Sequence, residues 1–113
     1  MRACFAIAVL ALLAVAPASR AQKGIRLLIP ADDTCSAFIA ALNSSDRAAM
    51  LDLGGWALGY LSGMAQQSGK DILHDVTSEG LMDRIAEACQ RQPGSQMSSI
   101  VMQIGNSLLA AAK

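Results

Sequence analysis

The sequence is poor in the residue types on which most catalytic and nucleic-acid-binding sites depend. Its 113 residues include one histidine, and nine basic residues are matched by nine acidic ones. The balance of charge leaves no basic face for a nucleic acid. No GxSxG nucleophile motif occurs, and the glycines follow no predicted strand that would make a phosphate-binding loop. We therefore expect no enzymatic activity and no cofactor.

Two small acidic groupings come nearest to a reactive site. Asp71, His74 and Asp75 lie at i, i+3 and i+4, where a helix could present them to a weakly held metal. In a polar loop, such residues more often meet only solvent. Asp83 and Glu87 lie one turn apart, which is more typical of a solvated helix face than of an acid–base pair. We expect no metal site and no catalytic residue.

The N-terminal apolar run is too short to cross a bilayer. Residues 5–15 are all apolar, whereas a spanning helix needs about 20 such residues. Arg2 precedes the run, and Ser19-Arg20-Ala21 has small residues at the positions that signal peptidase reads. We interpret residues 1–21 as a secretory signal peptide, cut before Gln22, and expect a periplasmic protein. The alternative is a membrane anchor, which the interrupting Pro17 and Arg20 oppose.

The mature chain, residues 22–113, then has two cysteines and forms one domain. It keeps seven basic and nine acidic residues, a formal charge of −2. Because an exported chain meets an oxidising compartment, we predict a disulfide between Cys35 and Cys89. Chain-entropy reasoning gives such a bridge about 4 kcal/mol of stabilisation. The alternative, a redox-active pair, would favour close CxxC spacing.

The sequence pattern predicts an all-α fold, a small four-helix domain with one interhelical disulfide. Apolar residues recur with helical spacing in four stretches after a short apolar arm at 22–30. The expected helix starts are Thr34, Asp46, Thr77 or Ser78, and Ser95. The expected stops are residues 43–45, Ser68-Gly69, Pro93-Gly94 and the alanine-rich C-terminus. No strand-like alternation competes with these patterns.

The second predicted helix carries the candidate binding face for a protein partner. Its apolar residues share one side of the helix, and the candidates are Leu53, Trp56, Tyr60, Leu61 and Met64.

Glycines recur every four residues along the same helix, at Gly55, Gly59 and Gly63. Each costs about 1 kcal/mol relative to alanine within a helix. We expect the resulting smooth ridge to let a neighbouring helix of the domain pack closely. The alternative is that the ridge forms a partner or homodimer surface.

Three short motifs give the chain a resemblance to a known family. They are Thr34-Cys35-x-x-Phe38, Trp56-x-x-Gly59-Tyr60, and Ile85 to Ala88-Cys89 followed by Pro93. The pattern resembles the HdeA/HdeB family of periplasmic acid-stress chaperones over most of the mature chain. An early cysteine, Gly59-Tyr60-x-x-Gly63 and a later cysteine before a proline are also similar to the Tai-type immunity proteins of type VI secretion.

The first resemblance implies a small helical bundle that is dimeric at neutral pH and opens in acid to hold unfolding client proteins on its apolar helix faces. Carboxylates would protonate as the pH falls, and stability that depends on their charge would be lost. The candidate carboxylates are Asp32, Asp33, Asp46, Asp52, Asp71, Asp75, Glu79, Asp83 and Glu87. The second resemblance implies instead an immunity or inhibitor-type protein that binds one specific partner through the Trp56 and Tyr60 face.

Overall fold

The computed structural model describes residues 26–112, which form four α-helices. They are α1 (Cys35–Asn43), α2 (Arg47–Ser68), α3 (Ser78–Arg91) and α4 (Met97–Ala111). The predicted all-α, four-helix domain is confirmed over this part of the chain. The predicted signal peptide, residues 1–21, lies outside the described residues. None of the helices in the described range is long and apolar enough to cross a bilayer.

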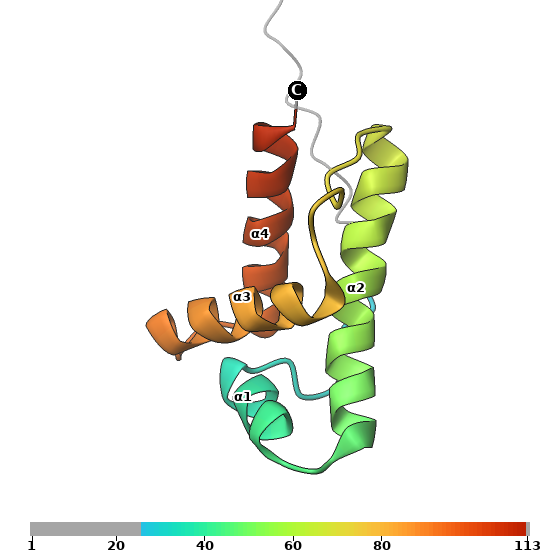
Figure 1. Cartoon of the computed structure of the whole chain (residues 1–113). Helices are drawn as coiled ribbons and strands as arrows, with labels where there is room; N and C mark the ends of the chain where they lie inside the picture. Colours follow the sequence, from blue (N-terminus) through green and yellow to red (C-terminus); the bar gives the residue numbers. More distant parts are fainter. Residues whose placement is uncertain (1–25, 113) are drawn as a thin grey trace, which may run out of the picture.

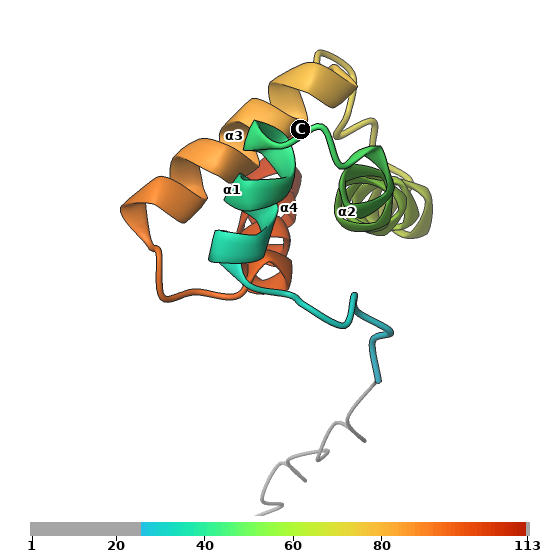
Figure 2. The same cartoon turned by 90° about the horizontal axis from the view of Figure 1, so that it is seen from below.

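The four helices pack as a ring in which each helix packs most extensively against two others. α2 and α4 lie side by side, and α3 crosses next to α4 at a steep angle (Figure 1). α1 packs against the N-terminal part of α2 and against α3. Viewed from below, α2 stands to one side of the other three helices (Figure 2). One flank of α2 is therefore left without a helix against it.

The core lies inside this ring and is built from the predicted apolar stripes. Every helix contributes to it, as expected for amphipathic helices that bury one face. Its largest fully buried side chains are Phe38, Leu61, Leu81, Ile85, Met97, Ile100 and Val101, together with the two cysteines.

The predicted disulfide is present between Cys35 and Cys89, whose Cα atoms are 5.1 Å apart. Both cysteines are buried. The bond joins the first turn of α1 to the last turns of α3, so two helices that are distant in the sequence are tied together at the core.

Three of the four helix starts follow the predicted capping pattern. The side chains of Thr34, Asp46 and Thr77 each accept a hydrogen bond from the backbone N–H three residues later. This satisfies a backbone donor that has no partner within the helix. Gly69 ends α2 in a left-handed conformation, with φ of 66°.

The fourth helix start differs from the prediction. Ser95 does not cap α4; Gln96 occupies the cap position and makes no side-chain capping hydrogen bond. Instead, the buried carboxylate of Asp33 accepts hydrogen bonds from the Ser98 backbone N–H, at 2.9 Å, and from the Ser98 hydroxyl. Thr34 and Gln96 form an antiparallel bridge beside it. The start of α4 is therefore fixed by a segment more than 60 residues earlier in the chain.

Candidate protein-binding face

Two of the five predicted contact residues lie on the buried side of α2. Leu53 and Leu61 are 5% and 0% exposed and belong to the core with Ala57. In the folded molecule they cannot touch a partner. The surface of α2 that a partner can contact is therefore smaller than the apolar pattern indicates. The same pattern also includes the residues that α2 buries in the core of the domain.

Trp56 and Tyr60 lie at the edge of the core and are partly buried. Their rings stack with centroids 5.2 Å apart and planes 15° from parallel. The indole Nε1 of Trp56 donates a hydrogen bond of 2.6 Å to the backbone carbonyl of Leu28. The segment that leads into the domain thus lies against the indole, and both rings are held in place.

The glycine ridge does not pack against a neighbouring helix of the domain, so that prediction is wrong. A Cβ atom added at Gly55, Gly59 or Gly63 would have no other part of the described structure within 4 Å. All three glycines are exposed, because on a helix their positions fall largely on the side opposite Ala57.

Two other glycines provide the close helix contacts instead. A Cβ at Gly54 would lie 3.2 Å from the Met82 sulfur, and one at Gly105 would lie 2.9 Å from Leu61 Cδ2. Both glycines are buried. The sequence thus shows several helical glycines, but their spacing alone does not distinguish those that pack from those that face open space.

A groove runs beside the open glycines, between the C-terminal half of α2 and α4. It encloses about 480 Å³ and presents almost entirely apolar surface. Its lining residues are Gly59, Tyr60, Gly63, Met64, Gln67 and Ser68 of α2, and Leu109 of α4. Tyr60 and Met64, both predicted contact residues, therefore line one groove, and Trp56 stacks against Tyr60 at its edge. Gln67 and Leu109 are not among the predicted contact residues, and Leu109 lines the groove with α2 only after the helices pack.

The acidic groupings do not line this groove. His74 Nδ1 is 2.8 Å from Asp75 Oδ1, and both side chains are largely exposed to solvent. Glu87 accepts a hydrogen bond from Arg91 on the surface of α3. Within residues 26–112, no three histidine, cysteine or acidic side chains come close enough together to hold a metal ion.

Comparisons of the chain with protein-family models, with curated proteins and with solved structures found no match. The resemblances to acid-stress chaperones and to immunity proteins therefore rest on the motif residues themselves.

Proposed function

We propose that this chain is an exported domain that binds one specific protein partner, with an apolar partner helix seated in the groove between α2 and α4. One observation carries the proposal: the groove is open and apolar in the folded molecule, beside glycines that the domain does not use. A contiguous apolar hollow on a small domain is a common feature of interaction sites.

The open glycines support the proposal on energetic grounds. Each glycine within α2 costs about 1 kcal/mol relative to alanine. Gly59 and Gly63 allow no closer packing in return, since a Cβ added at either would meet no neighbouring helix or side chain within 4 Å in the described structure. A partner backbone can come close to a helix only where side chains are missing. Binding of such a partner would therefore offset the helix-propensity cost of these glycines, which packing within the domain does not offset.

The two aromatic rings support a role as anchors. Aromatic residues contribute strongly to protein interfaces when part of the ring stays exposed. Trp56 and Tyr60 are fixed by their stacking and by the hydrogen bond to Leu28. Because the rings are already ordered, binding would cost little side-chain entropy.

A pair of matched variants tests the groove. Gly59→Leu places a side chain inside the groove, whereas Gly55→Leu places the same side chain on the open flank outside it. Mature protein immobilised at neutral pH would be exposed to periplasmic extract, and captured partners purified for calorimetric titration. We expect a saturable partner whose affinity is unchanged by Gly55→Leu and reduced at least tenfold by Gly59→Leu.

Sedimentation of the purified protein shows whether the partner is a second copy of this chain or a different protein. Equal binding by the two variants, or capture of many unrelated proteins with no saturable partner, would count against a specific groove. Circular dichroism of both variants would establish that any loss does not come from unfolding.

A second candidate function, acid-stress chaperoning, is favoured by a different observation. The carboxylate of Asp33 is buried and holds the first turn of α4 through Ser98. Loss of this negative charge would remove a favourable interaction with the helix N-terminus and weaken both hydrogen bonds. Release of α4 would uncover Leu61, a predicted client-binding residue that lies against α4 at Gly105.

The neutral variant Asp33→Asn tests the chaperone without acid. If loss of this charge opens the domain, the variant at pH 7 should bind an apolar dye to the same extent as we expect for the parent protein in acid. Sedimentation and the aggregation of an acid-sensitive client would be followed in parallel. A parent protein that stays folded and protects no client down to pH 2 would exclude this function while leaving the specific-partner proposal intact.

A further inference from the structure

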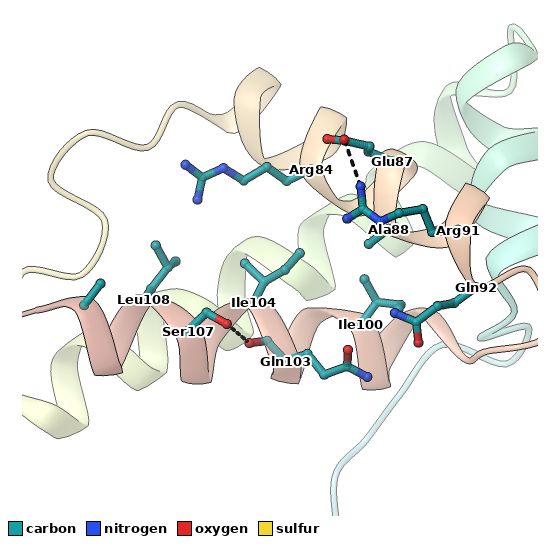
Figure 3. Close-up of a pocket in the computed structure, with 11 residues that line it drawn as sticks. Arg84, Glu87, Ala88, Arg91, Gln92, Ile100, Gln103, Ile104, Ser107 and Leu108 are labelled. Carbon is teal, nitrogen blue, oxygen red and sulfur yellow. Dashed lines mark hydrogen bonds and ion pairs between the residues drawn. The ribbon is translucent and has the colours of Figure 1, made fainter.

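A second hollow lies on the opposite side of α4, between α4 and α3, and it differs in character from the groove on α2. It encloses about 530 Å³, which is within the range of small-molecule sites. Figure 3 shows its two sides: α3 lies above with Arg84, Glu87 and Arg91, and α4 lies below with Ile100, Ile104 and Leu108.

The floor of this cleft is an apolar strip along α4. Ile100, Ile104 and Leu108 are spaced four residues apart, so their side chains lie on one face of the helix. The three residues span about 12 Å of the helix, given the helical rise of about 1.5 Å per residue, and the part open to a ligand is at Ile104 and Leu108. Ile100 is buried against the core, while Ile104 and Leu108 remain partly exposed. A slender apolar chain fits such a strip better than a broad planar group does.

The wall of the cleft on α3 carries net positive charge. Two arginines and one glutamate line it, and Arg91 Nη1 is 2.8 Å from Glu87 Oε1. Arg84 makes no ion pair with any residue in the range 26–112. Arg84 also borders an adjoining hollow with Asp71 and Asp75, and Asp75 is already paired with His74. Within the described part of the chain, the guanidinium of Arg84 is therefore without an ion-pair partner, and it lies above Leu108, where it can meet an anion (Figure 3).

The rest of the rim is polar but uncharged. Gln92, Gln103 and Ser107 complete it, and the Ser107 hydroxyl already donates to the Gln103 carbonyl. No aromatic side chain lines the cleft on which a nucleobase could stack. An apolar strip bordered by one free guanidinium therefore matches a ligand with an anionic head and an alkyl tail.

We propose that the cleft between α3 and α4 binds an anionic single-chain amphiphile, such as a fatty acid. The carboxylate lies on Arg84, which can receive it through two parallel hydrogen bonds, and the alkyl chain lies along Ile104 and Leu108. The inference is independent of the groove on α2, since the two sites share no residue.

Calorimetric titration of the mature, oxidised protein with decanoate, below its micelle concentration, tests the proposal. Decanol serves as the uncharged ligand of equal chain length. We expect saturable binding of one decanoate per chain and at least tenfold weaker binding of decanol. Arg84→Gln should weaken decanoate about tenfold and leave decanol unchanged. Arg47→Gln, which removes the same charge from the exposed start of α2, should change neither.

Amide chemical-shift mapping locates the bound chain. Shifts concentrated in residues 84–91 and 100–108 would support the cleft. Shifts concentrated in residues 59–68, together with loss of binding in Gly59→Leu, would overturn it in favour of the apolar groove on α2. Equal affinity for decanoate and decanol, or an Arg84→Gln variant that binds decanoate as the parent does, would also overturn it.

Discussion

At the scale of single residues, one buried carboxylate holds the start of α4. Asp33 is 6% exposed and accepts hydrogen bonds from the backbone and the hydroxyl of Ser98. Asp33→Ala would leave both donors without an acceptor in a buried place, so we expect the free energy of unfolding to fall by about 1 to 3 kcal/mol. Urea denaturation followed by circular dichroism measures the loss.

The matched control is the neighbouring exposed carboxylate. Among the described residues, the side chain of Asp32 accepts a hydrogen bond only from the Thr34 hydroxyl at the surface. Asp32→Ala should therefore cost less than Asp33→Ala. Equal losses of unfolding free energy in the two variants would show that the burial of Asp33 and its hydrogen bonds to α4 do not contribute to stability.

Two glycine-to-alanine substitutions should change stability in opposite directions. At Gly59 an added Cβ meets no neighbouring atom, so Gly59→Ala should stabilise by roughly 0.5 to 1 kcal/mol through helix propensity. At Gly105 the Cβ would lie 2.5 Å from the Met64 sulfur and 2.9 Å from Leu61 Cδ2. Overpacking costs typically 1 to 3 kcal/mol, so Gly105→Ala should be net destabilising. Thermal unfolding of both variants measures the two effects. Shifts in melting temperature of the same sign would contradict the conclusion that Gly59 faces open space and Gly105 is packed.

At the scale of elements, the sequence predicts helices well wherever the signal is local. Thr34, Asp46 and Thr77 act on the backbone three residues later, and Gly69 supplies a left-handed residue at the end of α2. Asp33 could not be identified as the partner of α4, because it reaches Ser98 only after the chain has folded. The side on which the open glycines lie was likewise not predictable, since it depends on which helices pack against α2.

The end of α2 offers a prediction at this scale. Gly69 adopts φ of 66° and its N–H donates to the Ala65 carbonyl. An alanine there would keep the hydrogen bond but force a side chain into the left-handed region, which costs about 1 kcal/mol or more. We expect Gly69→Ala to lower the free energy of unfolding by about that amount in urea titrations. Gly94, which is outside any helix and does not have positive φ, should tolerate alanine with little change.

At the scale of the whole molecule, sites between helices are harder to predict than the helices themselves. Tyr60 and Met64 were predicted from their place on one helix, yet the groove they line also needs Leu109 of α4. The cleft at Arg84 was not predicted at all, because it joins surface charges of α3 to half-buried residues of α4. Periodicity in one helix reports which residues face inward, but the pairing of helices decides which outward residues meet.

Removal of the disulfide would measure how much the stability of the four-helix ring depends on a covalent cross-link. α1 has nine residues, too few for a helix to be stable alone in water, and it is held by packing and by Cys35. Replacing both Cys35 and Cys89 by serine removes a cross-link that constrains the unfolded chain, at a cost of about 4 kcal/mol. Because small domains have only about 5 to 15 kcal/mol in total, we expect a large drop in melting temperature. Amide exchange should show α1 losing protection first, while a reductant added to the double variant should change nothing further. A double variant with the same melting temperature as the oxidised parent would instead mean that packing alone holds α1 against α3.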